Sequence, residues 1–340
     1  MRTVSFLPAI ILATFLAVAP APAADDPAPK VTPEDVLDGL KGFWKKTALP
    51  DGSFRPGVDP DYKGMSDSAL SDMAPLTYAV TLHRTFGWKL PHEEKTIANL
   101  LARQKDDGAF HHVHGTGDPK APLTRVYNTT QGLVALHALG VKPKYDPLPV
   151  FEKVLNGDHK KLPLYTTSFF PLAWRCAGKS FPARQDKKVR ALMPQADDGY
   201  LDDHIASTFH LVHYYRLMNE PTPKADAIVA RILREQKADG SWALNPLARD
   251  RHATFDAMFC LAQLGKDKPE VKRAMRKAVA WALSCRNRDG GFGHFPGSPS
   301  DADAVYFQVG TLVLAGYLAP VRPLPPDAHL LGWGHLLPAP

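Results

Sequence analysis

Carboxyl, imidazole and hydroxyl side chains recur at the start of the most apolar segments of this 340-residue chain. Carboxyl groups and imidazoles beside an apolar surface can exchange protons, and other polar groups there can orient a ligand. The residues with this placement are Asp67, Tyr127, Asn128, Asp203, His204, Arg251, His252, Asp256, Asp301, Asp303 and Tyr306. The competing interpretation is that they cap helices and lie in solvated turns.

Asp303, Asp301 and His252 are the candidates for proton transfer. Asp301 and Asp303 stand two residues apart, directly before an apolar run. A second carboxylate and nearby hydrogen bonds can keep a proton on an acid at neutral pH. The structural alternative is that Asp301 caps the next helix and Asp303 meets its positive N-terminal end.

Metal-binding patterns are weak in this sequence. His252, Asp256 and Cys260 share a helical face at i, i+4 and i+8, but the outer two lie about 12 Å apart, too far for one ion. The histidines at positions 111, 112 and 114 have no carboxylate or cysteine in their loop, and the three cysteines form no C-x-x-C pair. We therefore predict no metal site and no cofactor.

The elements that must position these residues are marked by recurring polar turns. Asp-Gly turns stand at five places, and a weaker turn stands at Asn156-Gly157-Asp158. The six central glycines are Gly52, Gly108, Gly157, Gly199, Gly240 and Gly290. Their spacings of 56, 49, 42, 41 and 50 residues indicate repeated helical hairpins. Six repeats predict about twelve helices.

The two helices of each predicted hairpin differ in character. The first carries a charged face, as with Arg231, Arg234 and Glu235, whereas the second is mainly apolar after a polar first turn, as in the run that stops at Gly316. Amphipathic helices belong on an outside and nearly all-apolar helices inside. The simplest closed arrangement is an inner ring within an outer ring. If the inner helices are parallel, their polar first turns meet at one rim of a central cavity.

The turns also carry a family signature. Residues 236–242, QKADGSW, match Q-x-x-D-G-x-W, and residues 104–110 match it with Phe in place of Trp. The chain therefore resembles the prenyltransferase and squalene cyclase (terpene cyclase) repeat family over about residues 33–318. The resemblance implies an all-α (α/α)6 toroid, whose cavity in the family holds isoprenoids or other apolar substrates.

The catalytic residues of that family do not carry over completely. Prenyltransferase β-subunits hold zinc through Asp-x-Cys and a His, and the corresponding positions here are Thr254, Asp256 and Ala304. Class II terpene cyclases use D-x-D-D, and this chain reads Asp301-Ala302-Asp303-Ala304, without the last Asp. Such cyclases also resemble two fused barrels, with about twice the helices expected here.

The chain ends suggest processing and packing. Residues 1–24 have the layout of a cleaved signal peptide, so we expect export to the periplasm or beyond the cell. Residues 25–32 are predicted to be a flexible leader and 33–318 the toroid. The Pro-rich tail, 319–340, carries Leu330, Leu331, Trp333, Leu336 and Leu337, and we expect it to lie against the toroid.

Charge and hydropathy exclude two classes of function. The net charge of +6 is spread among many carboxylates without a basic block, so nucleic acid is not expected as a partner. After the signal peptide, the sequence contains no uninterrupted apolar run of about 18 residues, so no membrane span is expected.

Three functions remain open for the cavity. The first is binding of an apolar or mixed-polarity ligand, isoprenoid-like in the resemblance, or of a protein partner, without chemistry. The second is an enzyme that acts on an isoprenoid-like substrate with Asp303 as general acid. The third is an exported carbohydrate-active α/α-barrel enzyme, since paired carboxylates and aromatic platforms suit glycans. The sequence leaves open whether the protein is an enzyme.

Overall fold

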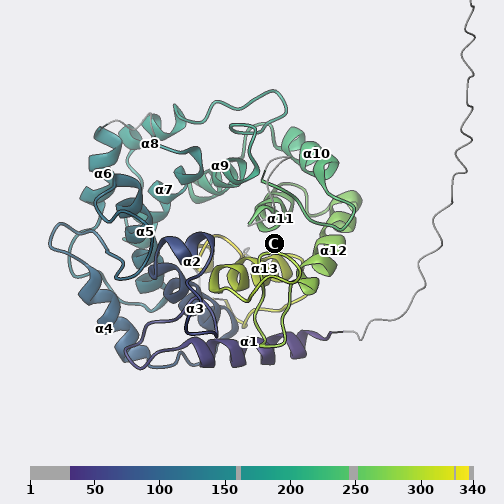
Figure 1. The fold of residues 1–340 in the computed structure, drawn as a ribbon. Helices are drawn as coiled ribbons and strands as arrows, with labels where there is room; N and C mark the ends of the chain where they lie inside the picture. Colours follow the sequence, from purple (N-terminus) through teal and green to yellow (C-terminus); the bar gives the residue numbers. More distant parts are fainter. Residues whose placement is uncertain (1–30, 158–161, 245–251, 325–326, 337–340) are drawn as a thin grey trace, which may run out of the picture. The chain divides into compact units, whose positions relative to one another are not determined.

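A computed structural model describes residues 31–157, 162–244, 252–324 and 327–336 (Figure 1). The predicted signal peptide and nearly all of the predicted leader lie outside the described residues, as does Arg251. Residues Thr32–Pro340 form one compact unit, which is described by itself below.

The described part of this unit contains thirteen α-helices and no β-strand beyond isolated bridges. The outer helices are α1 (Pro33–Thr47), α4 (Glu93–Arg103), α6 (Leu148–Asn156), α8 (Ala183–Arg190), α10 (Ala225–Glu235) and α12 (Pro269–Ser284). The inner helices are α3 (Met73–Phe86), α5 (Pro122–Ala138), α7 (Phe169–Cys176), α9 (Ile205–Leu217), α11 (Ala253–Leu264) and α13 (Ala302–Leu314). A short helix, α2 (Ser66–Leu70), precedes α3.

The inner helices form a closed ring. Each packs against the next in chain order, from α3 to α13, and α13 packs back against α3. The labelled ribbons follow the same circle, with the even-numbered helices from α4 to α12 outside it (Figure 1). The predicted (α/α)6 toroid is therefore confirmed, and an open spiral of hairpins is excluded.

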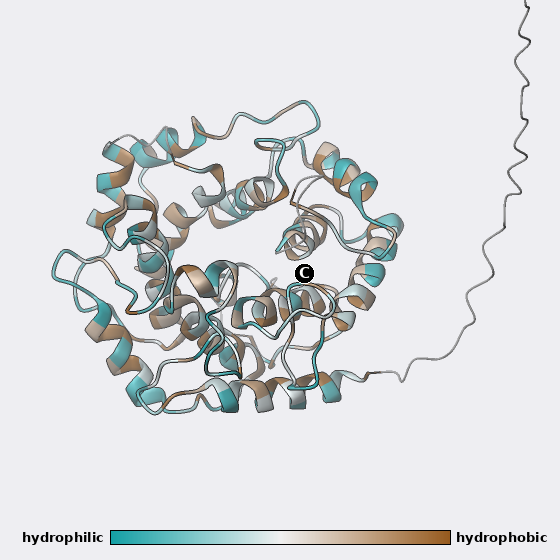
Figure 2. Ribbon diagram, in the orientation of Figure 1, coloured by the Kyte–Doolittle hydropathy of each residue, from teal (hydrophilic) through white to brown (hydrophobic). Residues whose placement is uncertain are grey.

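Burial follows the predicted difference between the two rings. Every residue of α13 is buried, whereas α10 buries only Ile228, Val229 and Ile232 on one face. Outer helices accordingly alternate hydrophilic and hydrophobic faces in Figure 2. The apolar stripe of each outer helix is removed from water by the inner helices, which is the main force that holds the double ring together.

The Asp-Gly turns share one construction. In each of the five, the Asp carboxylate accepts a hydrogen bond from the backbone N–H two residues on, and the glycine has a positive φ of 83–93°. A side chain is also excluded by space. A Cβ on Gly108 would lie 2.0 Å from the carbonyl oxygen of Asp146 at the entry to α6. Each such turn thus fixes its own bend and its contact with the next outer helix.

The signature glutamines tie neighbouring repeats together. The Gln236 amide donates to the carbonyls of Gly240 in its own turn and Ala274 in α12, and Gln104 bridges Gly108 and Tyr145 in the same way. Gln195, which the sequence comparison did not single out, does the same. Arg286 occupies the glutamine position of the last repeat and donates to the Asp35 carbonyl of α1, which helps to close the ring.

Two inner segments start differently from a simple hairpin. In the first repeat the chain forms α2, breaks at Ser71 and begins α3 at Met73, so that Pro75 lies in the first turn of α3. In the third repeat Pro171 is the third residue of α7, where its missing N–H would have no helical partner in any case. Both prolines therefore mark late helix starts rather than kinks.

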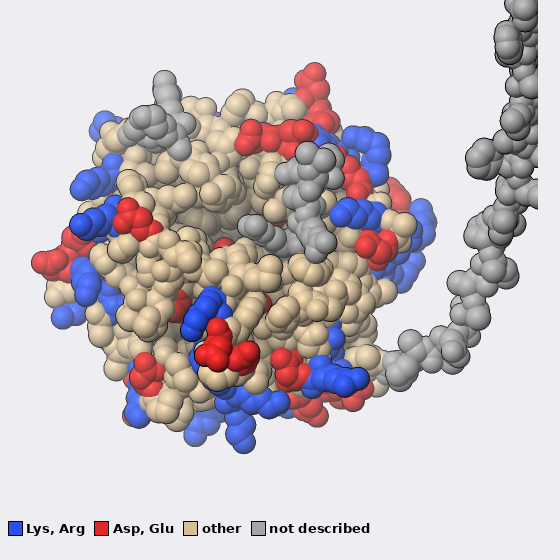
Figure 3. Space-filling model, viewed as in Figure 1, with Lys and Arg blue, Asp and Glu red and all other residues tan. Residues whose placement is uncertain are grey.

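The described part of the tail lies against the ring, as expected. Leu330, Leu331, Trp333 and Leu336 are all buried. Leu337 lies outside the described residues. Charged side chains of both signs are scattered around the face in Figure 3, and uncharged side chains border its central hollow. Within the described ranges, each helix is too short or too polar to cross a bilayer.

Candidate functional site

The first turns of the inner helices converge on a cavity of about 500 Å³. Side chains reach it from α2 and from the first two turns of α5, α7, α9, α11 and α13, with one residue from the tail. Its aromatic lining is Tyr127, Tyr165, Phe169, Phe209, Phe307 and Trp333, and its main polar lining is Asp67, Thr124, Thr166, His204, His210, His252 and Asp256. The parallel inner helices thus bring together polar residues that are nearly 190 positions apart, as predicted for the rim.

The aromatic lining forms a packed wall. Phe169 contacts Trp333 with ring centroids 4.9 Å apart, and Phe307 stacks on the imidazole of His252 at 3.8 Å. Phe209 packs against both Phe255 and Phe259 behind it. Rings held in this way present a fixed apolar surface, suited to a hydrocarbon and able to stabilise a cation over their faces.

Asp67 is one of two carboxyl groups of the described residues that line the cavity, together with Asp256. Its Oδ2 accepts a hydrogen bond from the Tyr78 hydroxyl at 2.6 Å, and its backbone N–H donates to Asp303 Oδ2 at 3.0 Å. Burial raises the pKa of Asp67; the His252 imidazole opposes this rise, whereas the negative charge of Asp303 adds to it. Asp67 is thus a carboxyl group that holds its proton to higher pH than usual, next to an apolar wall.

Asp303 lies behind the wall and is completely buried. One carboxylate oxygen is 2.8 Å from Nε2 of His294 and the other is 3.5 Å from Nε2 of His252. Burial alone favours the neutral acid, but His294 and His252 outweigh it and hold the pKa of Asp303 below its ordinary value. Asp303 is therefore a carboxylate within an ion-paired cluster, and His252 is the member of that cluster that reaches the cavity.

Asp301 serves mainly as a structural acceptor. It is the N-cap of α13 and accepts from the Asp303 N–H, as the structural interpretation expects. Its Oδ2 also accepts from the Tyr62 hydroxyl and the Met65 N–H, both at 2.7 Å. Burial and the adjacent Asp303 raise the pKa of Asp301 well above its ordinary value. It does not line the cavity.

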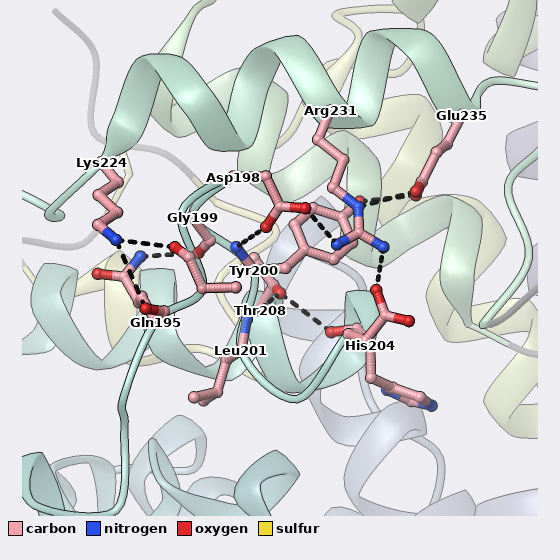
Figure 4. Close-up of polar contacts among 12 residues, drawn as sticks. Gln195, Asp198, Gly199, Tyr200, Leu201, His204, Thr208, Lys224, Arg231 and Glu235 are labelled. Carbon is pink, nitrogen blue, oxygen red and sulfur yellow. Dashed lines mark hydrogen bonds and ion pairs between the residues drawn. The ribbon is translucent and has the colours of Figure 1, made fainter.

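Several predicted residues lie away from the cavity. Asp203 is 80% exposed and pairs with Arg231 of α10. Figure 4 shows this arginine also holding Asp198 of the turn and Glu235, so the Asp203 carboxylate is directed to the outer ring. Asn128 is buried against Ser71, whose hydroxyl donates to it at 2.6 Å, and His112. Tyr127, His204 and Asp256 do line the cavity, as predicted. Arg251 lies outside the described residues.

Tyr306 anchors the tail rather than facing the cavity. Its hydroxyl accepts from the Trp333 N–H at 2.6 Å and lies 3.1 Å from Nδ1 of His335, whose Nε2 is 2.7 Å from the Thr85 hydroxyl. Gly332 has a φ of +65°, and a Cβ there would lie 2.4 Å from the Tyr306 hydroxyl. These contacts hold the Trp333 ring in the cavity wall.

The sequence analysis missed His294, Tyr78, His210 and His335. His294 follows the sixth turn by four residues, in a loop with no pattern of its own. His210 lies on α9 six residues after the N-cap His204, about 240° around a helix of 3.6 residues per turn, so spacing from His204 does not place it on the cavity side. Tyr78 and His335 stand in apolar stretches, and no local signal links Tyr78 to Asp67 or His335 to Thr85 and Tyr306.

The zinc set of the prenyltransferases does not fit this chain. Of the corresponding positions, Thr254, Asp256 and Ala304, only Asp256 offers a good ligand. A different trio, His252, His294 and Asp303, has ligand atoms within 4.8 Å of one another. His294 already touches the carboxylate at 2.8 Å, whereas two ligands of one tetrahedral zinc stand roughly 3.3 Å apart. In this structure the two imidazoles contact the Asp303 carboxylate directly.

Comparison with known proteins places the fold. Similarity to curated relatives is confined to part of each. The β-subunit of geranylgeranyl transferase type-1 from Arabidopsis thaliana is 26% identical over 125 residues, 34% of this chain and 31% of that protein. Drimenyl diphosphate synthase from Streptomyces showdoensis is 29% identical over 104 residues, 30% of this chain and 20% of that protein. The chain thus matches less than a third of either relative's length.

Similarity to solved structures extends over the whole toroid. Type II terpene cyclase MstE from Scytonema, in complex with merosterolic acid A (product), is 16% identical and has a TM-score of 0.58. The match covers 84% of this chain and 98% of that chain, and at this identity it shows the fold alone. The expectation that a class II cyclase needs about twice the helices present here is therefore wrong, because MstE is matched over nearly its full length by this single toroid.

The family itself is established over more than half of the chain. A model of the prenyltransferase alpha-alpha toroid domain matches residues 153–333, which include four of the six inner helices and the aromatic wall up to Trp333. The chain belongs to the prenyltransferase alpha-alpha toroid domain family.

Proposed function

We propose that the cavity binds an isoprenoid-like ligand, with its hydrocarbon chain along the aromatic wall and its polar or reactive end beside Asp67 and His252. The observation that carries this proposal is the placement of a few polar groups at one side of a cavity otherwise walled by Phe169, Phe209, Phe307 and Trp333. That combination is typical of sites for apolar small molecules.

The relatives support the same class of ligand. MstE was solved in complex with geranylgeranyl dihydroxybenzoate (substrate), at 13% identity, a TM-score of 0.55, and coverage of 84% of this chain and 96% of that chain. The carbohydrate alternative is supported less, because glycan sites use exposed aromatic platforms. Among the described residues, Tyr165 is the one aromatic side chain that is exposed.

The test is extraction and mass spectrometry of small molecules that co-purify with the native protein, followed by titration of delipidated protein with geranylgeraniol. Leu123→Arg places a charge on the cavity wall from a half-buried position of α5 and should abolish binding. Leu139→Arg, at the half-buried opposite end of the same helix, should leave binding intact. Equal binding by wild type and Leu123→Arg would show that the ligand lies elsewhere.

A second candidate function is protonation of a bound alkene by Asp67. The raised pKa and cavity position of Asp67 favour it as the acid over Asp303, whose pKa is lowered and which lies behind the wall. The Asp67 proton would form the new C–H bond, leaving a carboxylate and a carbocation over the aromatic faces; the cation would then return a proton to the Asp67 carboxylate, or add a water molecule whose proton goes to that carboxylate.

This chemistry has a distinct pH signature. Because the acid must be protonated, turnover should be present at low pH and fall as the pH rises through the pKa of Asp67. Asp67→Asn should abolish product formation from the co-purified ligand while ligand binding persists. Product formation by Asp67→Asn at the wild-type rate would exclude Asp67 as the acid.

We also propose that the protein works after export, as the sequence of residues 1–24 predicts. N-terminal sequencing of the mature protein, recovered from a bacterial host, should find a start near Asp25. A mature protein that begins at Met1 contradicts export through this segment.

A further inference from the structure

A second pocket lies at the opposite ends of the inner helices. It has a volume of about 770 Å³ and is formed by the last turns of α7, α9 and α11 and by the tail. Its hydrogen-bonding side chains include Arg175, Arg216, Gln263 and His329, with Asn219 at the edge. Most of these groups are donors, in contrast to the carboxylates around the first cavity.

The two arginines lack acidic partners. Arg175 Nε donates to the Leu217 carbonyl at 3.2 Å, and Arg216 Nη1 donates to Gln263 Oε1 at 2.7 Å. Within the described part of the chain, neither guanidinium forms an ion pair. The single carboxylate on the pocket, Glu220, is 2.7 Å from Arg190 outside it.

Arg84 of α3 occupies the position that corresponds to Arg175 of α7, and it has both a carbonyl and an acidic partner. Its Nε donates to the Ala138 carbonyl at the end of the next inner helix, as Arg175 does to Leu217, but its Nη2 pairs with Glu93 at 2.8 Å. The contact to the carbonyl is therefore a repeated structural feature of the ring. Of these two arginines, Arg84 has an acidic partner and Arg175 has none among the described residues.

Donor capacity in the pocket remains unused. Arg216 Nε and Gln263 Nε2 are buried atoms without a hydrogen-bond partner in the described residues. Burial lowers the pKa of His329, and the charges of Arg216 and Arg175 lower it further, whereas Asp327 opposes them. Two like charges and unpaired donors in one half-buried pocket are costly, and an anion would relieve both costs.

We propose that this pocket binds a phosphate-bearing anion through Arg175, Arg216, Gln263 and His329. Guanidinium groups match phosphate oxygens in bidentate geometry, and two of them with an imidazole and an amide offer more donors than one carboxylate could accept. The site is separate from the aromatic cavity, so it does not depend on the ligand proposed there.

The experiment is isothermal titration calorimetry of the full chain with inorganic phosphate and with pyrophosphate at low ionic strength. Arg216→Gln and Arg175→Gln should each weaken binding about tenfold or more, the loss expected for one charge-assisted contact. Asn219→Asp, at an exposed position where Asp tolerates the positive φ, should weaken it by placing a negative charge at the edge. Arg84→Gln is the matched control and should bind as wild type.

Two further arms identify the source of the phosphate. Co-sedimentation with phosphatidic acid vesicles but not with phosphatidylcholine vesicles indicates a lipid headgroup. Heat evolved with pyrophosphate alone indicates a free anion. Either result supports the site if Arg216→Gln and Asn219→Asp weaken that binding. No binding in any arm, or equal loss of binding with Arg84→Gln, overturns the proposal.

Discussion

At the N-terminal ends of the inner helices, Asp301 accepts three hydrogen bonds and Asp303 meets two histidines. At the C-terminal ends, Arg175 and Arg216 pair with no carboxylate of the described residues. Helix dipoles explain the sign at each end, because N-termini favour anions and C-termini favour cations. They do not explain the difference in pairing. The acidic groups at the N-terminal ends have partners within the protein. At the C-terminal ends, hydrogen-bond donors of Arg216 and Gln263 have no partner among the described residues.

This contrast separates two kinds of polar residue that look alike in a sequence. A buried polar group whose partners are all protein atoms stabilises the structure, and its removal is measured in stability. A buried group with unused capacity is available to a ligand, and its removal is measured in affinity. Asp67 lies between these kinds, since it has partners and also lines the cavity.

The largest expected effect comes from removing the centre of the acidic cluster. Asp303→Ala leaves His252 and His294 without their buried counter-charge and should lower the free energy of unfolding by roughly 3–5 kcal/mol. The measurement is urea unfolding at pH 7. Asp203→Ala removes an exposed partner of Arg231 and should cost less than about 1 kcal/mol. Similar losses in both variants contradict the distinction between the ion-paired cluster and the surface.

The ring could be predicted from the sequence because five of the six repeats carry an Asp-Gly turn. Asp-Gly with a partner glutamine specifies a bend and a contact to the next helix, and both are local consequences of residue type. Closure followed from the contrast between charged and apolar helices. What the sequence could not give was the late start of α3, because the break after α2 depends on Ser71 bonding both Asn128 and the Met73 N–H.

The site was predicted less completely, and Asp67 and Asp203 show why. Both are acidic residues in the segment before an inner helix, and no local pattern tells them apart. Asp203 is directed outward by Arg231, 28 residues later, whereas Asp67 is held on the cavity wall by Tyr78, Asp303 and the turn of α2. The tail contributes Trp333 to the wall across an even longer separation. Such partners are set by the tertiary fold.

The tail should make the stability of the protein depend on pH. It contributes Trp333 to the aromatic cavity and His329 to the second pocket, and it also carries the buried His335. Burial lowers the pKa of His335 to about 3, from 6.5 in an exposed histidine. Since the unfolded chain binds this proton and the folded chain does not, stability rises with pH between these values. Lowering the pH from 7 to 5 should cost about 2 kcal/mol through His335 alone.

His335→Gln tests this contribution, because an amide can replace the contacts to Thr85 and Tyr306 without titrating. The loss of stability between pH 7 and 5, measured by urea unfolding, should be about 2 kcal/mol smaller than in wild type. The exposed His92, changed to Gln, serves as the control. If the stability of His335→Gln depends on pH as strongly as that of wild type, the tail separates from the ring before His335 is protonated.

The smallest expected change in stability compares two arginines at the C-terminal ends of inner helices, Arg84 of α3 and Arg175 of α7. Arg84→Gln removes a half-exposed ion pair with Glu93 and should cost about 0.2–1 kcal/mol in thermal or urea unfolding. Arg175→Gln keeps a polar side chain and breaks no ion pair within the described residues, so its cost should be smaller than that of Arg84→Gln. A loss equal to that of Arg84→Gln means that Arg175 stabilises the ring as Arg84 does, and the C-terminal end then differs from the acidic end only in sign.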